Sequence, residues 1–115
     1  MSMTATTRKV ERVSIVDLSG RITIGEGTAV LKEAVRSLLN KHEMKILLNL
    51  GAVSYIDSSG IGELVSSFTT AGKQGGKLKL LNLTRKVHDL LSITKLLTVF
   101  EVFDDEAKAI RSFDS

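Results

Sequence analysis

The run Ile46-Leu47-Leu48 lies between two segments that have the apolar spacing of amphipathic helices. Those segments are residues 28–40 and 60–73, in which aliphatic side chains recur three and four positions apart. A short continuous apolar run is typical of a strand that is buried on both faces of a sheet, and we expect this strand to end near Leu50. A strand that is flanked by helices needs crossover connections, so part of the sheet must be parallel.

The segments on either side complete an alternation of strands and helices. Residues 8–18 are predicted to form two strands joined by a turn at Glu11-Arg12, and Gly20 is expected to end the second strand. The later elements are, in chain order, a strand over 77–83, a helix over 84–92, a strand over 97–102 and a final helix after Asp104 or Asp105. This order predicts the α/β class, with a mixed β-sheet of four to five strands and about four α-helices.

Length and composition indicate one domain. The chain has 115 residues, of which 43% are apolar and 25% are charged, as is ordinary for a globular protein. We assign residues 1–7 to a flexible, polar N-terminal tail and residues 8–115 to the domain.

Several classes of function are disfavoured by what the chain lacks. There is no cysteine and there are only two histidines, which excludes a thiolate metal site and an all-imidazole one. We expect no metal and no cofactor. Aromatic residues make up 4% of the chain and the net charge is only +3, which argues against a nucleic-acid partner. No apolar run approaches the ~20 residues that span a bilayer, and the N-terminus has no apolar signal segment. We therefore expect a cytoplasmic protein without a membrane span.

The segment from Asp57 to Gly62 carries the residues most suited to chemistry. Asp57, Ser58 and Ser59 stand where the predicted buried strand feeds the helix over 60–73. Serine and aspartate are preferred there as N-caps, because their oxygens accept hydrogen bonds from unpaired N–H groups. One such residue is enough for capping, whereas three stand here in a row. The same N–H groups and the helix dipole favour an anion, so this position can carry a phosphate on Ser58.

The sequence Asp57-Ser58-Ser59-Gly60-Ile61-Gly62 resembles the phosphorylation loop of bacterial anti-sigma factor antagonists. These are stand-alone STAS (sulfate transporter and anti-sigma factor antagonist) domains. The resemblance covers residues 8–112 and includes four further segments, at 18–22, 46–50, 75–78 and 87–91.

The resemblance implies a STAS-type fold and a regulatory role in bacterial transcription, such as a stress response, without enzyme activity. In this family, the serine directly after the aspartate is phosphorylated by a partner that is both a serine kinase and an anti-sigma factor. That serine is Ser58 here, and Ser59 is a secondary candidate. The unphosphorylated form binds the partner and releases a sigma factor. The phosphorylated form does not bind, and a serine phosphatase resets the switch.

The resemblance also implies which residues contact the partner. They are Asp57, Ser58, Ser59, Gly60, Ile61 and Gly62, together with Gly20, Arg21 and Thr23. Thr23 departs from the family pattern, which often has an acidic residue at this position. Because this segment borders the partner surface in the family, the identity of the partner stays open. The oligomeric state is also open between a monomer and a weak dimer.

Two other functions are compatible with parts of the sequence. A STAS domain can be a subunit of another assembly, such as a stress-signalling complex or a lipid transporter. Alternatively, Ser58, His88 and Asp57 could be the catalytic triad of a small serine hydrolase. The second alternative is disfavoured because the Gly-x-Ser-x-Gly elbow is absent, and because an aspartate adjacent to the serine cannot easily orient a distant histidine.

Overall fold

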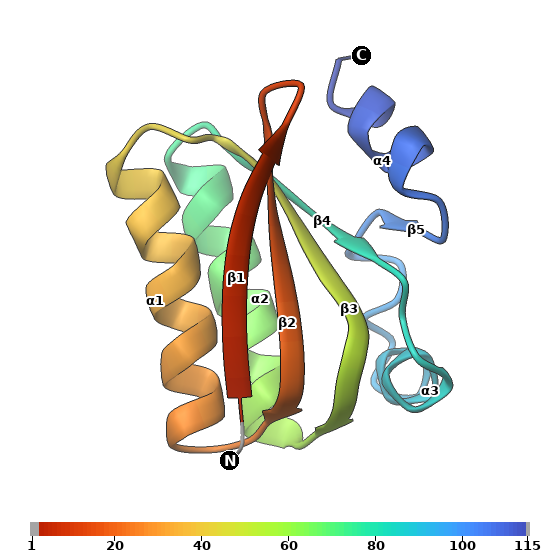
Figure 1. Cartoon of the computed structure of the whole chain (residues 1–115). Helices are drawn as coiled ribbons and strands as arrows, with labels where there is room; N and C mark the ends of the chain where they lie inside the picture. Colours follow the sequence, from red (N-terminus) through yellow and green to blue (C-terminus); the bar gives the residue numbers. More distant parts are fainter. Residues whose placement is uncertain (1–2, 115) are drawn as a thin grey trace.

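The computed structural model describes residues 3–114, which form one sheet and four helices (Figure 1). The elements are, in chain order, β1 (Met3–Val10), β2 (Val13–Ile22), α1 (Glu26–Asn40), β3 (Lys45–Ile56), α2 (Ser58–Lys73), β4 (Lys77–Leu81), α3 (Arg85–Ile93), β5 (Val102–Phe103) and α4 (Glu106–Ser112). The five strands follow the order β1-β2-β3-β4-β5. β1 is antiparallel to β2, and the other neighbours are parallel. The predicted α/β class with a mixed sheet is therefore confirmed.

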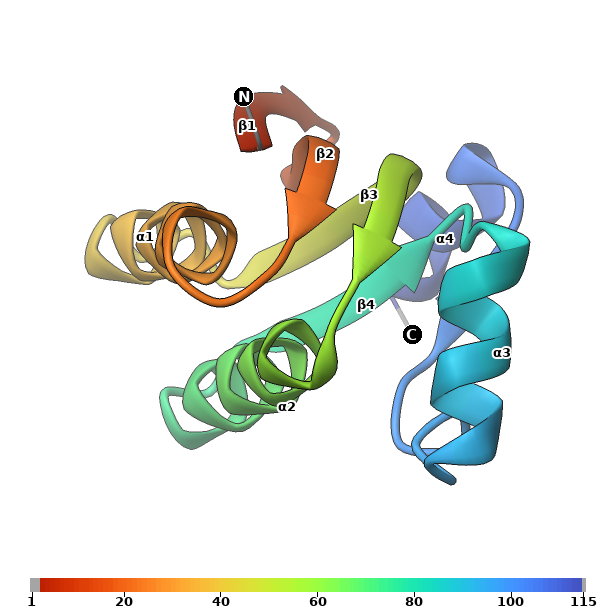
Figure 2. The ribbon, with the colours of Figure 1, turned by 90° about the horizontal axis from the view of Figure 1, so that it is seen from below.

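Helices cover both faces of the sheet (Figure 2). α1 and α2 lie side by side on one face and share the larger core with it. α3 adds Val87 and Leu91 to that core, whereas α4 packs a smaller core against the other face. Along β3, Ile46 and Leu48 belong to the larger core and Leu47 to the smaller one. This division explains why the apolar run in β3 is continuous.

The N-terminal segment differs from its expected state. Residues 3–7 belong to β1, which pairs with β2 from Met3 to Val10, so they are not a flexible tail. Residues 1 and 2, the rest of the expected tail, lie outside the described residues. The segment is polar because β1 lies at the edge of the sheet, and its threonines suit a half-exposed strand. The predicted turn is confirmed, since Glu11 and Arg12 have φ angles of 48° and 74°.

The bounds of other strands also differ from those expected, and β4 ends at Leu81 instead of residue 83. β2 continues through Gly20 to Ile22, and β3 continues past Leu50 to Ile56. The two strands pair with each other over these extensions, with shifts of register near Gly20. By contrast, the strand expected over 97–102 is reduced to β5 at its end, because residues 96–99 form turns in which the Val99 N–H bonds to the Leu96 carbonyl.

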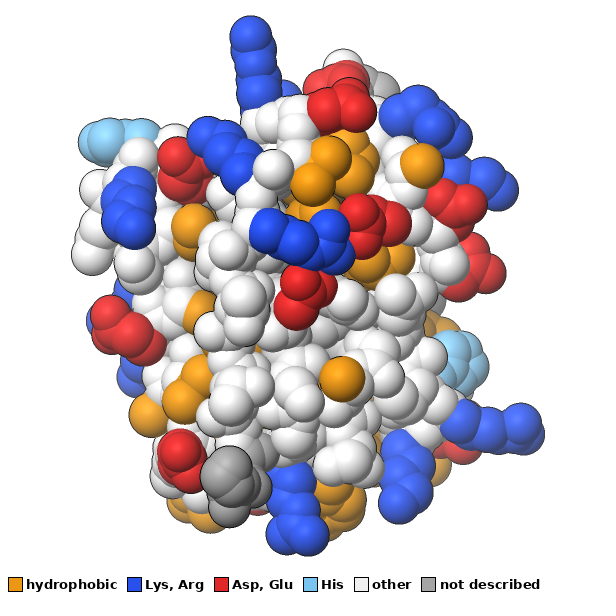
Figure 3. Space-filling view, in the orientation of Figure 1, with side chains coloured by type: hydrophobic (Ala, Val, Ile, Leu, Met, Phe, Trp, Pro, Cys, Tyr) orange, Lys and Arg blue, Asp and Glu red, His pale blue; other side chains and the backbone are white. Residues whose placement is uncertain are grey.

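Charged side chains of both signs are interspersed on the face seen in Figure 3, and hydrophobic atoms show there in small separate areas.

An ionic network ties three elements together. The Arg8 guanidinium on β1 lies 2.7 Å from Asp17 on β2 and 2.7 Å from Glu106 on α4. Asn49 on β3 extends the network by donating a hydrogen bond to Asp17 at 2.8 Å. The network connects the edge strand to the C-terminal helix.

Candidate functional site

The ends of β2 and β3 lie next to each other and lead into the N-termini of α1 and α2 (Figure 1). Two glycines let both helices approach the end of β2. A Cβ atom on Gly27 would overlap the carbonyl oxygen of Arg21, and one on Gly60 would overlap the carbonyl oxygen of Ile22. Both positions therefore require glycine. This close approach fixes the place of the first turn of α2 relative to the loop after β2.

Asp57 is the N-cap of α2. Its Oδ1 atom accepts a hydrogen bond from the Gly60 N–H at 2.8 Å, and its Oδ2 atom accepts one from the Ile24 N–H at 3.1 Å. These hydrogen bonds, that of Gly60 first, lower the pKa of Asp57 below its ordinary value. Asp57 is therefore ionised at neutral pH, and it joins the helix to the loop after β2.

Ser58 and Ser59 occupy the first two positions of α2, and neither is its cap. The pattern of three polar residues left open which of them caps the helix, and the structure assigns this role to Asp57. The Ser58 side chain is exposed, whereas that of Ser59 is half-buried. Within residues 3–114, no hydrogen bond holds the Ser58 hydroxyl group. Ser58 is thus the accessible hydroxyl at the start of this helix.

A surface hollow of about 460 Å³ lies beside Ser58. It is lined by Tyr55, Ile56, Asp57, Ser58, Ile61, Leu90 and Thr94. Ile61 is only 7% exposed, so it forms the wall of the hollow and does not project from the surface. Leu90 and Thr94 come from the end of α3, which therefore completes the site from the other side.

The predicted residues at the end of β2 reach the same region. Gly20 has a φ angle of 112°, and its carbonyl oxygen accepts a hydrogen bond from Ser54 Oγ at 3.3 Å. Arg21 is exposed and lies opposite Tyr55 in the ladder. The Thr23 carbonyl accepts a hydrogen bond from the Thr28 N–H at 3.0 Å, which closes the loop before α1. The two segments that sequence analysis selected are therefore neighbours at the carboxyl ends of β2 and β3.

The sequence matches a known protein family. The family model of the STAS domain covers residues 4–109. The chain belongs to the STAS domain family. The anti-sigma-B factor antagonist of Bacillus subtilis is 32% identical to this STAS domain over 87 residues, which are 76% of this chain and 78% of that protein. The anti-sigma F factor antagonist of Paenibacillus polymyxa is 24% identical over 102 residues, or 89% of this chain and 87% of that protein.

Solved structures share the fold of this STAS domain. An anti-sigma factor antagonist from Mycobacterium paratuberculosis matches with a TM-score of 0.84 and 21% identity, over 99% of this chain and 96% of that one. The Bacillus cell fate determinant SpoIIAA in its phosphorylated form matches with a TM-score of 0.74 and 18% identity, over 96% and 99% of the two chains. The STAS-type fold implied by the sequence is therefore confirmed.

Sequence analysis missed the apolar surface around Ser58. Ile24 is 76% exposed in the loop that Asp57 holds, and Tyr55 is 47% exposed at the end of β3. Ile93, also 76% exposed, lies on α3 between Leu90 and Thr94, which line the hollow. Tyr55 could have been noticed as the only tyrosine of the chain, two residues before Asp57. No signal in the sequence showed that α3 lines the hollow, because only the fold brings α3 close to Ser58.

Ser58, His88 and Asp57 do not form the catalytic triad that a serine hydrolase needs. His88 borders a different hollow, together with Asn82 and Phe103, and its Nδ1 atom lies 3.5 Å from Asp89. Asp57 uses its carboxylate for main-chain N–H groups. Among the described residues, no group of three or more acidic or histidine side chains could hold a metal ion. Over the same residues, none of the helices is long and apolar enough to cross a membrane.

Proposed function

We propose that this STAS domain is an anti-sigma factor antagonist that phosphorylation of Ser58 switches off. Its unphosphorylated form binds an anti-sigma factor that is also a serine kinase, and this binding releases a sigma factor. The kinase phosphorylates Ser58, which ends the binding, and a serine phosphatase restores the first state. The observation that carries the proposal is the exposed Ser58 hydroxyl at the start of α2, where Asp57 provides the cap.

The division of roles between Asp57 and Ser58 supports a switch. Because Asp57 caps α2 and holds the Ile24 loop, Ser58 can be modified without loss of a structural hydrogen bond. A phosphate adds about −1.5 to −2 charges at pH 7. That charge would stand beside the Asp57 carboxylate on an exposed surface. The local potential therefore changes sharply, while the backbone contacts that position the loop stay in place.

The surroundings of Ser58 support a partner that makes apolar contacts. Tyr55 is exposed in the wall of the hollow beside the serine, together with Leu90 and Ile61. Ile24, in the loop that Asp57 holds, and Ile93, at the end of α3, are also exposed. A few buried anchor residues, tyrosine among the most frequent, supply most of the binding energy at protein interfaces. A dianion that is enclosed in such an interface without a matching cation costs several kcal/mol. Each ~1.4 kcal/mol is a tenfold loss of affinity, so the phosphate prevents binding.

The acceptor serine is tested by incubation with the kinase and ATP, followed by mass spectrometry. We expect one phosphate on the wild-type chain, none on Ser58→Ala, and an unchanged yield on Ser59→Ala. The Ser59 variant is the matched control, since it removes the neighbouring hydroxyl from the same helical turn. A phosphate found mainly on Ser59 or elsewhere contradicts the assignment.

The direction of the switch is tested by calorimetry with the anti-sigma factor. Ser58→Ala should bind as the wild type does, and Ser58→Asp should bind at least about tenfold more weakly. Thr69→Asp places the same charge on an exposed position further along α2 and should bind normally. Equal affinities of Ser58→Ala and Ser58→Asp would show that a charge at this position does not control the complex.

The apolar surface is tested separately by Ile24→Ser and Ile93→Ser. Both side chains are 76% exposed, so their replacement should leave the melting temperature unchanged while it weakens binding. Val102→Ser on β5 is the matched control, because Val102 is an exposed valine that does not border the Ser58 hollow. If both isoleucine variants bind like the wild type, the partner docks on another surface.

A further inference from the structure

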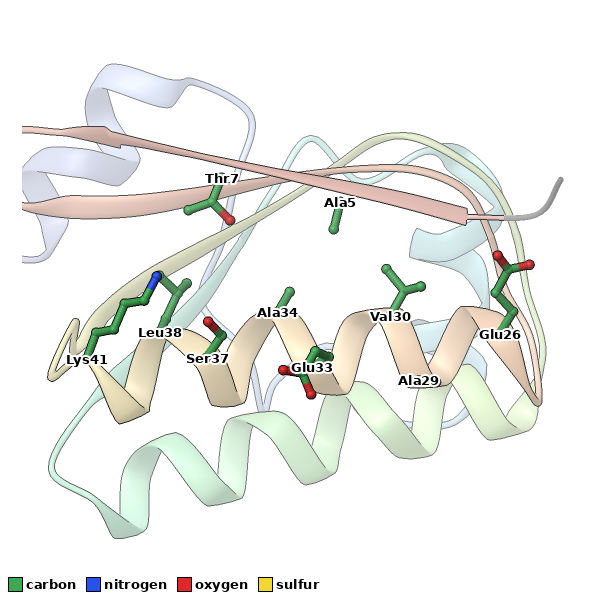
Figure 4. A pocket seen from close by; sticks show the side chains of 10 residues that line it. All are labelled: Ala5, Thr7, Glu26, Ala29, Val30, Glu33, Ala34, Ser37, Leu38 and Lys41. Atoms are coloured by element: carbon green, nitrogen blue, oxygen red, sulfur yellow. The ribbon is translucent and has the colours of Figure 1, made fainter.

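A groove of about 500 Å³ runs between β1 and α1, along the side of the molecule (Figure 4). Small and apolar side chains from both elements form it, among them Ala5, Val30 and Ala34. Glu33 and Lys41 stand at its border. The larger side chains of α1, such as Leu31 and Val35, point into the core instead. α1 therefore has a second, half-buried side, which packs against the border of the core and stays partly open to the groove.

The edge of the sheet lies directly beside this groove. β1 is an edge strand with eight residues and without proline. In a hairpin with a two-residue turn, the pair that flanks the turn is hydrogen-bonded, here Val10 and Val13, and bonded pairs then alternate along the strands. The N–H and C=O groups of Ala5, Thr7 and Lys9 therefore point away from β2. Such a row of main-chain groups is a template for another strand.

We propose that the occupant of this side is a second copy of this chain, related to the first by a two-fold axis. β1 of each copy pairs antiparallel with β1 of the other, which joins the two sheets into one. Both α1 helices then lie on the same face, antiparallel to each other, and cover the groove. This self-association is independent of the proposed phosphorylation switch.

The spacing of the layers fits this arrangement. α1 packs over both β1 and β2, so its axis runs close to the line midway between them. Neighbouring strands are about 4.8 Å apart. A helix in that place is then about 10 Å from its symmetry mate, which is an ordinary distance between packed helices. Alanine and serine on the facing sides, Ala29, Ala34 and Ser37, leave room for this approach.

The charges along the groove favour the antiparallel orientation. Lys41 lies at one end, Glu26 lies at the other, and Glu33 lies between them (Figure 4). An antiparallel helix pair directs Lys41 of each copy towards the acidic part of the other, within reach of Glu33. Within residues 3–114, neither Glu33 nor Lys41 has an ion pair in the single chain. A parallel pair would instead place lysine beside lysine.

Self-association is measured by sedimentation equilibrium over a range of protein concentrations. We expect the mass to rise from 12.5 kDa towards twice that value. Lys41→Glu should weaken the dimer about tenfold, and Glu33→Lys should do the same. The double variant Glu33→Lys/Lys41→Glu should restore it, because the pairs are then re-formed with exchanged signs. Lys73→Glu, at the exposed end of α2, is the control for a change of net charge.

The strand pairing has its own test. Thr7→Pro removes an outward N–H group, and proline is tolerated on an edge strand when its nitrogen faces solvent. This variant should fold with an unchanged circular dichroism spectrum but stay monomeric. In the wild type, amide hydrogen exchange of Ala5, Thr7 and Lys9 should slow as the concentration rises. A wild-type mass of 12.5 kDa at all concentrations overturns the proposal, and so does a dimer that Lys41→Glu and Thr7→Pro leave unchanged.

Discussion

The Oδ2 atom of Asp57 accepts a hydrogen bond from the main-chain N–H of Ile24 at 3.1 Å, across 33 positions of sequence. The other oxygen of the same carboxylate caps α2 through the Gly60 N–H. One side chain therefore fixes the exposed loop after β2 to the helix that carries Ser58. Ser58 and the exposed Ile24 are therefore presented by segments that one carboxylate joins.

Asp57→Ala should lower the melting temperature, because α2 loses its cap and the Ile24 loop loses its anchor. Asp57→Asn should lower it less, since one acceptor oxygen is retained. The lowered pKa of Asp57 means that its ionised form stabilises the fold above the ordinary aspartate pKa. This contribution is lost as the pH falls through the lowered value, so the wild type and Asp57→Asn should converge in acid. Thermal melts from pH 7 to pH 2 check the expectation, with the exposed Asp104→Ala as control.

Gly60→Ala should destabilise the protein by at least about 2 kcal/mol, since the added methyl group meets the Ile22 carbonyl oxygen and the Ile56 side chain. Gly62→Ala is the matched control two residues later in the same helix, where a Cβ meets nothing within 4 Å. It should stabilise the fold by up to about 1 kcal/mol. Urea unfolding measures both. Equal effects of the two changes would mean that α2 does not press against the end of β2.

Lys79→Ala should loosen α4. The Lys79 side chain is nearly buried, donates hydrogen bonds to the carbonyl and hydroxyl oxygens of Ser112 at 3.1 and 3.0 Å, and lies 4.6 Å from the centre of the Phe113 ring. Loss of these contacts should cost about 2 kcal/mol. Lys79→Met, which keeps the apolar packing, should cost less. Urea unfolding distinguishes them, and the exposed Lys77→Ala on the same strand should be neutral.

Arg8→Met should remove part of the acid sensitivity of the fold. Hydrogen bonds from Arg8 are the first cause that lowers the pKa of Asp17 and that of Glu106. Their ionised forms therefore stabilise the protein above the ordinary carboxyl pKa values, and this stabilisation disappears as the pH falls through the lowered ones. The groups are about one third exposed, so the effect at pH 7 should be about 1 kcal/mol or less. Melts of Arg8→Met and the exposed Arg12→Met at pH 7 and pH 3 check it: only the Arg8 variant should approach the wild type in acid.

Phosphorylation of Ser58 should change binding far more than it changes the fold. Among the described residues, the Ser58 hydroxyl has no hydrogen-bond partner, and the favourable helix dipole is opposed by repulsion from Asp57. A net effect near 1 kcal/mol shifts the melting temperature of a domain of this size by roughly 4–8 °C at most. Amide chemical shifts should move mainly in residues 57–64 and, through the Asp57 bond, in residues 22–25. Shifts spread over the whole sheet would show that the modification acts by unfolding.

The sequence by itself determined the fold class and the place of the polar segment before α2. The apolar run at Ile46 required a strand buried on two faces, and the periodicity of the helical segments required crossovers between parallel strands. Both signals are local, since they depend on residues a few positions apart. The same holds for the polar residues before α2, whose types suit a helix N-terminus in any fold.

The tertiary structure alone decided which residues act together. Threonines at 4, 6 and 7 look like a polar tail until β2 supplies partners for their main chain. Asp57 not only caps α2 but also holds the loop after β2, because the Ile24 N–H, far away in sequence, reaches its second oxygen. Leu90 and Tyr55 line one hollow because α3 and β3 meet beside Ser58. These facts rest on contacts between distant segments, and no pattern of neighbouring residues encodes such contacts.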